Sequence, residues 1–211
     1  MIIAIDGPAA AGKGTLARRL AAHFDLAFLD TGRLYRAVGY AILQAGNDPN
    51  DPEIAVAAAR ALDPENVVAG DLYTEQVAET ASVVAAIADV RKELLTFQRK
   101  FARHPPGGKN GAVLDGRDIA SVVCPGATHK FFVTASAKVR ARRRIKELQE
   151  NGVESTYAAV LADIEQRDQR DRTRKVSPLK SVDARVIDTS GKTPDAVFEE
   201  ALAHIEGEQS K

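Results

Sequence analysis

The stretch from Gly7 to Thr15, with the sequence GPAAAGKGT, combines glycines, one lysine and one hydroxyl residue at a spacing suited to holding phosphate groups. Glycine lets the backbone curl so that successive N–H groups point toward an anion. Apolar residues 1–5 precede the stretch and a helical pattern follows it, so it lies between a predicted strand and a predicted helix. The helix N-terminus would add partial positive charge, and Lys13 a full one. The pattern predicts a loop that binds a nucleoside triphosphate, formed by Gly7, Pro8, Ala9, Ala10, Ala11, Gly12, Lys13, Gly14 and Thr15.

The end of this stretch departs from the common pattern G-x-x-x-x-G-K-[ST]. Gly14 follows Lys13, and the hydroxyl comes one place later, at Thr15. The ending GKGT is similar to that of nucleoside-monophosphate kinases rather than that of GTPases or motor ATPases. This ending weakens the case for direct ligation of Mg²⁺ by a loop hydroxyl, and we assign no residue as a metal ligand. An ordinary turn rich in small residues is the alternative to a phosphate loop.

Two more polar stretches follow predicted strands. DTGRLYR, residues 30–36, comes after apolar residues 26–29, and DGRD, residues 115–118, comes after residues 112–114. In open α/β sheets, ligands bind at the carboxyl ends of the strands. We therefore expect both stretches on the same rim as the phosphate loop. A simple turn is the alternative for residues 115–118.

Arginine and aspartate alternate along a predicted helix that covers residues 163–174. Three of them share one face at i, i+4 and i+7: Arg167, Asp171 and Arg174. Asp168 and Arg172 repeat the spacing one residue further round. Guanidinium groups bind phosphate oxygens through forked pairs of hydrogen bonds, so this face could close on transferring phosphates. A solvated, salt-bridged helix is the alternative.

A second basic stretch lies in the helix that Ser136 can begin, before the breaker Asn151-Gly152. Its basic residues fall within nine positions: Lys138, Arg140, Arg142, Arg143, Arg144 and Lys146. Contact with phosphate and a solvated basic face are both open interpretations, because charge runs usually face water.

Predicted strands alternate with predicted helices along the chain. Strands are expected at residues 1–5, 26–29, 112–114, 130–134 and 185–188. Helices are expected at about 13–24, 34–43, 51–62, 136–150, 156–172 and 195–205, and residues 74–101 are helix-permissive with room for a break. Residues 63–73 and 104–111 are expected to form loops. This alternation predicts the α/β class, with a parallel sheet covered by helices on both faces.

Composition excludes several classes of protein. The 211 residues include 45% apolar residues, which suits a globular core, and 29 basic residues balance 29 acidic ones. A general nucleic-acid or membrane-surface binder is usually more basic, so we expect neither partner. Cys124 is the single cysteine, which excludes an internal disulfide and a CxxC site. Asp6 interrupts the first apolar run, and no run approaches a membrane span, so the expected location is cytoplasmic.

Taken together, the motifs give the chain a family resemblance from Met1 to the last helix. It resembles the bacterial cytidylate kinases, which are nucleoside-monophosphate kinases. The carrying motifs are IDGP through KGT, LDTG with YR, TASVVA (80–85), VRKELL (90–95), DGRD (115–118) and RDQRDR (167–172). The resemblance implies a P-loop NTPase-type three-layer sandwich with strand order 2-3-1-4-5. It also implies a single P-loop kinase domain over residues 1–211, with a core (about 1–35, 110–150 and 180–211), a monophosphate-binding insertion (about 36–109) and a helical lid (about 151–178).

The resemblance further implies an activity and a set of site residues. The activity is phosphorylation of CMP and dCMP to CDP and dCDP, with ATP as donor, Mg²⁺ and a monomeric enzyme. Lys13, Arg117 and Arg174 would act in catalysis. The acceptor nucleotide would contact Thr31, Arg36, Ser82, Arg91, Arg117, Asp118, Arg167, Asp171 and Arg174. Among these, Asp118, Arg167, Asp171 and Ser82 would read the cytosine or ribose side, and Arg36 would lie near the phosphate.

One departure and two rival functions stay open at this point. Some members carry an added small sheet in the insertion, and residues 63–73 are too short to hold it, which bears on the choice among CMP, dCMP and UMP. A kinase of a small metabolite such as a sugar acid would not need the set of Ser82, Arg91, Arg117 and Asp118. A nucleotide-dependent nucleic-acid binding module would use residues 138–146, but zero net charge and few aromatic residues argue against it.

Overall fold

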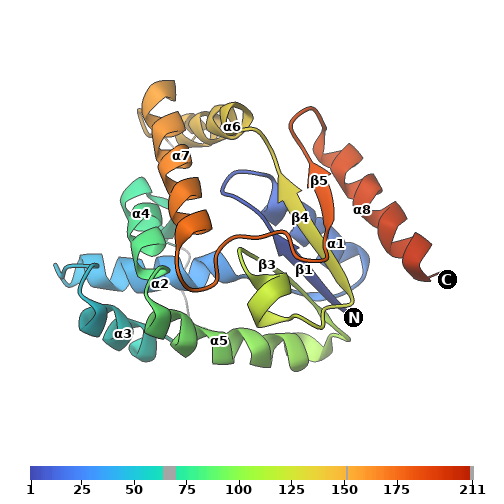
Figure 1. The fold of residues 1–211 in the computed structure, drawn as a ribbon, viewed down its shortest axis with the longest axis horizontal. Helices are drawn as coiled ribbons and strands as arrows, with labels where there is room; N and C mark the ends of the chain where they lie inside the picture. The colour runs from blue at the N-terminus through green and yellow to red at the C-terminus, as the bar shows by residue number, and fades with distance from the viewer. Residues whose placement is uncertain (64–69, 151, 210–211) are drawn as a thin grey trace.

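The computed structural model describes residues 1–63, 70–150 and 152–209 (Figure 1). Its strands form one parallel sheet in the order β2-β3-β1-β4-β5. The strands are β1 (Ile2–Asp6), β2 (Ala27–Asp30), β3 (Ala112–Gly116), β4 (His129–Thr134) and β5 (Arg185–Asp188). The predicted fold class and strand order are therefore confirmed. Because β1 lies in the middle, the phosphate loop that follows it is flanked by the ends of β3 and β4.

Alternating side chains of the central strands build a core on each face of the sheet. Ile3 and Ile5 pack with α1 (Lys13–His23) and α8 (Pro194–Gln209), on the side where Figure 1 shows these two helices. Ala4 and Leu114 pack on the opposite face against α5 (Ala88–Arg103) and a π-helical turn, η3 (Ile119–Val123). This two-residue alternation is that of a strand covered on both sides, and it gives the three layers.

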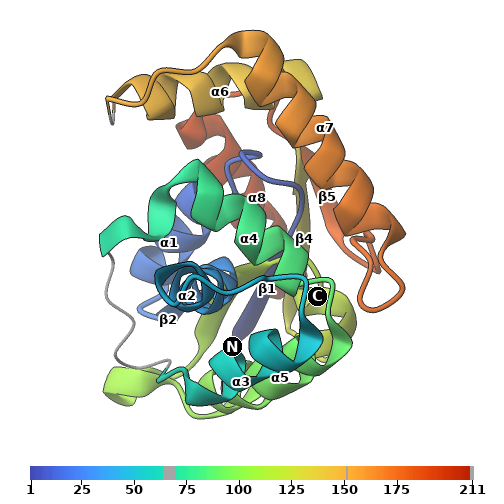
Figure 2. The same cartoon turned by 90° about the vertical axis from the view of Figure 1, so that its left-hand side faces the viewer.

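Two helical groups stand beyond the sheet. The first packs around Leu34, Val38, Val84 and Leu94, and its helices are α2 (Thr31–Gln44), α3 (Pro52–Ala61), α4 (Glu75–Val84) and α5. The second is the pair α6 (Ala137–Glu150) and α7 (Tyr157–Thr173), which packs through its own small core. Figure 2 shows α6 and α7 arching over the end of the sheet that carries the phosphate loop, opposite α2 and α4.

Several element boundaries differ from expectation for local reasons. Helix α2 begins at Thr31 instead of Leu34, because the Asp30 carboxylate accepts the N–H of Arg33 at 3.3 Å and caps it. Strand β3 runs two residues further, to Gly116. Residues 74–101 divide at Ala85–Ile87 into α4 and α5. Gly70–Tyr73 form a 3₁₀ turn, η1, where a loop was expected, and the rest of the predicted short insertion, residues 64–69, lies outside the described residues.

Two further observations complete the architecture. Helix α6 ends at Glu150 and Gly152 has a φ of +72°, as expected of a breaker, while Asn151 lies outside the described residues. In the described part of the chain, no helix combines the length and the apolar character that crossing a membrane requires.

Candidate active site

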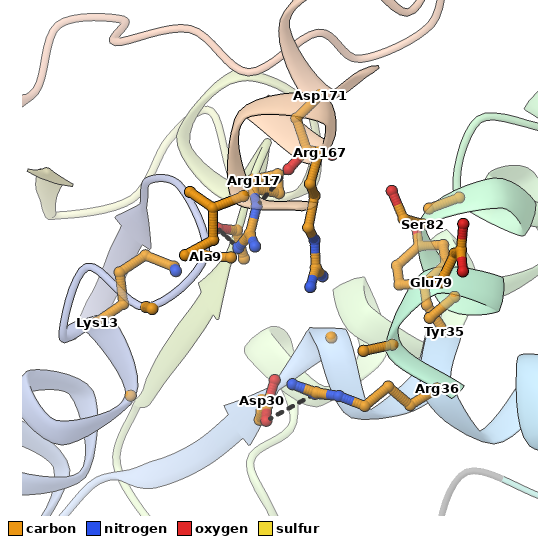
Figure 3. A pocket seen from close by; sticks show the side chains of 18 of the residues that line it. Ala9, Lys13, Asp30, Tyr35, Arg36, Glu79, Ser82, Arg117, Arg167 and Asp171 are labelled. Carbon is orange, nitrogen blue, oxygen red and sulfur yellow. Dashed lines mark hydrogen bonds and ion pairs between the residues drawn. The ribbon is translucent and has the colours of Figure 1, made fainter. Parts of the chain in front are cut away.

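A cavity of about 620 Å³ lies between the phosphate loop and the two helical groups. Its walls come from the loop, the carboxyl ends of β2 and β3, helices α2 and α4 on one side, and α6 and α7 on the other. Figure 3 shows Arg167 reaching down from α7, with Lys13 at one edge and Ser82 and Glu79 at the other. Segments far apart in the sequence therefore meet in one space.

The phosphate loop has the backbone shape that its glycines predict. Gly7 has a φ of +150°, and a Cβ there would lie 1.9 Å from the carbonyl oxygen of Val133, so only glycine fits. Gly12 has a φ of +92° immediately before α1. Six of the nine predicted loop residues line the cavity: Ala9, Ala10, Gly12, Lys13, Gly14 and Thr15. Gly7 and Ala11 are buried behind them, and the carbonyl of Pro8 accepts a hydrogen bond from Lys13.

Lys13 is buried and electrostatically poised. Its Nζ donates to the Pro8 carbonyl at 2.9 Å and lies 3.8 Å from the Asp115 carboxylate. Burial, together with the nearby charge of Arg117, lowers the pKa of Lys13 to about 8. The ammonium group is thus still charged at neutral pH. Its surroundings compensate this charge less well than water compensates that of a surface lysine, which favours the binding of an anion.

The ends of β2 and β3 are tied to one another and to helix α7. Thr31 donates its hydroxyl to the carbonyl of Asp115 at 2.8 Å, across the rim. Arg117 Nε donates to the Asp171 carboxylate of α7 at 2.9 Å. Arg36 lies 3.7 Å from Asp30 and stacks over the Tyr73 ring at 5.0 Å. Residues 115–118 therefore form more than a simple turn, because they connect the rim to α7.

A buried ion pair on the side of the cavity formed by α2, α4 and α5 joins two other predicted residues. Arg91 of α5 contacts the Asp118 carboxylate at 2.5 Å, and both side chains are 7% exposed. Arg91 also donates to the Ala85 carbonyl at 3.1 Å and lies over the Tyr35 ring at 5.3 Å. Ser82 is buried next to them, and its Oγ has no hydrogen-bond partner among the described residues. A buried hydroxyl left unpaired in a cavity wall is suited to a polar ligand atom.

Helix α7 directs its predicted arginines into the cavity. Burial, then the charge of Arg117, lowers the pKa of Arg167 to about 9, and its Nε lacks a partner within the described residues. Burial by itself would raise the pKa of Asp171, but the charges of Arg117, Arg167 and Arg174 outweigh it and lower that pKa. Arg174 lies 3.6 Å from Asp171. Of the five charged residues singled out on this helix, Arg172 alone fits the solvated-helix interpretation, because it is 64% exposed.

The basic residues of α6 divide between the two interpretations. Arg142 and Lys146 are exposed, whereas Arg144 lines the cavity. Arg140 is buried, bridges both oxygens of Asp168 at 2.9 and 2.6 Å, and donates to the Ala9 carbonyl of the phosphate loop at 3.3 Å. Sequence reasoning did not assign the Arg140–Asp168 pair, which ties α6 and α7 to the loop. The sequence signal for this pair was the i, i+4 spacing of Asp168 and Arg172, and exposed ion pairs on helices have the same spacing.

Two acidic residues near the loop were given no individual site role from the sequence. Asp115, which the stretch 115–118 placed on the rim, lies beside Lys13. Asp6 is 2% exposed, and burial raises its pKa to about 6 even though two backbone N–H groups bind it. In the sequence Asp6 stands out only as the end of the first apolar run and as part of the motif IDGP, neither of which indicates a buried cap. Among the described residues, no group of three or more histidine, cysteine, aspartate or glutamate side chains could hold a metal ion.

A phosphate loop at the end of the central strand, facing a cavity lined with arginines, defines a P-loop kinase. Comparisons with known proteins make the assignment narrower. The family model described as cytidylate kinase matches residues 3–207, and the chain belongs to that family. It is 58% identical to a cytidylate kinase of Paramagnetospirillum magneticum over 97% of each chain, and 55% identical to one of Rhodospirillum rubrum over 96% of this chain and 95% of the relative.

Solved structures of lower identity share the fold. An uncharacterized protein from Eubacterium ventriosum superposes with a TM-score of 0.59 at 13% identity, covering 98% of each chain. The shikimate kinase of Bacteroides thetaiotaomicron has a TM-score of 0.51 at 13% identity, also over 98% of each chain. At these identities the likeness shows the fold alone, and the family assignment rests on the relatives that are more than half identical.

Proposed function

We propose that the protein transfers the γ-phosphoryl group of ATP to CMP or dCMP, giving ADP and CDP or dCDP. The observation that carries the proposal is that Lys13 of the phosphate loop and Arg117, Arg167 and Arg174 open into one cavity, next to the Arg91–Asp118 pair. Two polyanions need such a concentration of positive charge to approach each other. Membership of the cytidylate kinase family supports cytosine nucleotides as acceptors.

The mechanism needs alignment more than proton transfer. The attacking atom of a nucleoside monophosphate is already a phosphate oxygen, so no strong general base is required. Lys13 and the loop N–H groups hold the donor phosphates, and Arg117, Arg167 and Arg174 neutralise charge that spreads over the transferred group. Asp171 accepts a hydrogen bond from Arg117 Nε at 2.9 Å, which fixes the position of the Arg117 guanidinium.

Magnesium would enter with ATP rather than occupy a site of its own. Mg²⁺ is commonly held by substrate phosphates and only one or two carboxylates, and the residues around Lys13 fit that arrangement because Asp115 is the nearby carboxylate. When bound, Mg²⁺ supplies further neutralisation of the outer phosphates. A requirement for Mg²⁺, a monomeric state and a cytoplasmic location stay predictions for this chain.

We also propose the predicted division into core, monophosphate-binding insertion (about 36–109) and lid (about 151–178). Packing supports the insertion, because α2 to α5 share a core of their own, and it joins α7 of the lid to α6, the helix at the end of the core segment 110–150, through a separate small core. Lid closure would exclude water, which could otherwise accept the phosphoryl group. With ATP and CMP together, we expect backbone amides over residues 152–178 to exchange hydrogen at least about tenfold more slowly. Unchanged exchange there would remove the lid from the proposal.

The acceptor base would be read on the insertion side of the cavity. Ser82 and Asp118 are the buried groups there that can hydrogen-bond an amino-pyrimidine edge, with Arg91 holding Asp118 in place. Recognition by buried hydrogen-bonding groups discriminates strongly, because the wrong base leaves them unpaired. We therefore expect CMP and dCMP to be preferred over UMP and AMP.

The test is ADP production from Mg²⁺-ATP with CMP, dCMP, UMP and AMP in parallel. Strong turnover of CMP and dCMP alone is the expected result. Equal turnover of all pyrimidine nucleotides would keep the kinase and discard the base reading. No turnover of any nucleotide by protein that binds ATP would overturn the proposal and indicate a metabolite kinase.

A further inference from the structure

Asp6 is the last residue of β1, directly before the phosphate loop, but it does not line the cavity. Its carboxylate is buried and points sideways, from the centre of the sheet toward the segment that follows β3. Oδ1 accepts the N–H of Ile119 at 2.8 Å, and Oδ2 accepts the N–H of Ala120 at 2.8 Å. These two contacts join strand β1 to a turn more than a hundred residues away in the sequence.

The turn that Asp6 holds carries Arg117 and Asp118. It continues into η3, where the N–H groups of Val122 and Val123 donate to the Asp118 carbonyl at 2.9 and 3.1 Å. The first N–H groups of any helical turn have no partner within it, and a side chain at the N-cap position usually accepts them. Asp118 occupies that position but makes no side-chain cap. Asp6 takes over the capping from outside the turn.

Transferring the cap to Asp6 has a consequence for the acceptor side of the cavity. Had Asp118 capped its own turn, its carboxylate would be engaged with backbone N–H groups. Instead it faces the cavity and contacts Arg91 at 2.5 Å. Arg117, one residue earlier, is turned toward Asp171. The hydrogen bonds from Ile119 and Ala120 to Asp6 fix the backbone next to Arg117 and Asp118, and so set the direction of both side chains.

Aspartate suits position 6 better than other capping residues, because two N–H groups must be accepted there. A serine or asparagine could cap one N–H without placing a charge in the protein interior, where an ionised carboxylate is costly. Only a carboxylate presents two equivalent acceptors to two adjacent N–H groups. The cost of burying this negative charge is consistent with the pKa of Asp6, which burial raises to about 6. The two hydrogen bonds that the Asp6 carboxylate accepts therefore fix both the position and the orientation of the turn.

We propose that Asp6 is a positioning residue for the acceptor nucleotide, acting through the backbone of Ile119 and Ala120 on Asp118 and Arg117. The inference rests on the proposed function and adds to it a residue that touches neither substrate. Because Asp6 also directly precedes the phosphate loop, one residue links the backbone of the donor site to that of the acceptor site.

The test compares Asp6→Asn with the parent protein. The amide keeps one acceptor but turns an NH₂ group toward the second N–H, which releases the turn on one side. We expect the Kd for CMP, measured by calorimetry, to rise at least about tenfold, the size seen when a supporting group no longer orients a binding residue. The Kd for a non-hydrolysable ATP analogue should stay within about threefold, since that ligand uses the loop and Lys13.

Asp51→Asn is the control for the same substitution at a helix cap outside the site. Asp51 Oδ1 alone accepts two backbone N–H groups, those of Glu53 at 2.9 Å and Ile54 at 3.4 Å, at the start of α3 and away from the cavity. Its nucleotide affinities should equal those of the parent. Equal loss of CMP and ATP-analogue affinity in Asp6→Asn would make Asp6 a general structural residue and overturn the inference, as would parent-like CMP affinity.

A measurement on the parent protein covers the case in which Asp6→Asn does not fold. The amides of Ile119 and Ala120 should exchange hydrogen as slowly as the central strands, with or without CMP, because their acceptor is buried. Fast exchange at both amides would overturn the inference. Inactivity of the parent with CMP would overturn the proposed function and leave the capping itself to this exchange measurement, so the two failures are distinguishable.

Discussion

Replacing Lys13 by alanine is expected to lower kcat by about a thousandfold or more without unfolding the protein. Removing one preorganised donor from a developing negative charge typically costs about 10²–10³ in rate, and Lys13 carries a full charge in a buried site. The fold should survive because the change removes a cation whose burial is itself unfavourable, as its lowered pKa indicates. Steady-state ADP production measures kcat, and circular dichroism measures the fold.

The matched control for Lys13→Ala is Lys192→Ala. Lys192 is more exposed and pairs with Glu200 on the surface, outside the cavity. Its loss should leave kcat within about twofold, because surface ion pairs contribute little. A near-normal kcat in Lys13→Ala, with the fold intact, would contradict the role of Lys13 in holding the donor.

Because the pKa of Lys13 is lowered, we expect a rise in pH to have opposite effects on activity and on stability. Its pKa of about 8 means that the free enzyme loses the Lys13 charge as pH rises through 8, so kcat/KM for ATP should fall about tenfold per unit above that value. In the unfolded chain the pKa of Lys13 returns to the ordinary lysine value of 10.5. Between the two values the unfolded state binds more protons, so this group's contribution to stability increases with pH. A rate profile combined with urea unfolding from pH 7 to 10 separates the two effects.

Sequence reasoning succeeded where chemistry is encoded in consecutive residues. The phosphate loop, the acids at the ends of β2 and β3, and the arginine face of α7 were each identified from a local pattern with a physical reason. The family and the strand order, which came from several such motifs in sequence, are confirmed. The structure adds that the predicted acceptor residues, from four helices and the turn after β3, reach one cavity, while their individual roles stay predictions.

What the sequence did not predict depends on contacts between distant segments. Nothing near Asp6 indicates that its partners are the N–H groups of residues 119 and 120. Arg140 and Arg142 are chemically alike and two positions apart, yet one is buried against Asp168 and the other is exposed. Helical periodicity places them on different faces, but only the packing of α6 on α7 decides which face is inside.

Replacing Arg167 by methionine is expected to change activity and stability in opposite directions. Arg167 is half-buried beside Arg117, its Nε has no partner among the described residues, and its pKa is lowered to about 9. The free enzyme thus holds repelling cations together, a repulsion that nucleotide phosphates would relieve. Methionine keeps the apolar stem and removes the charge. We expect kcat/KM for CMP to fall at least about a hundredfold, since a charged hydrogen bond to substrate is lost, while Tm rises by about 3 °C or more.

Arg172→Met is the control on the same helix. Arg172 is 64% exposed and lies only at the edge of contact with Asp168, at 4.0 Å, so its loss should alter neither kcat/KM nor Tm appreciably. Added CMP and ATP should also raise the Tm of the parent more than that of Arg167→Met, because only the parent has the Arg167 charge for phosphate to neutralise. If Arg167→Met instead lowered Tm and left kcat/KM unchanged, Arg167 would be a structural partner of Asp171. We therefore expect substrate binding to relieve the crowding of cations around the cavity, so that the stability cost of this crowding follows from its binding function.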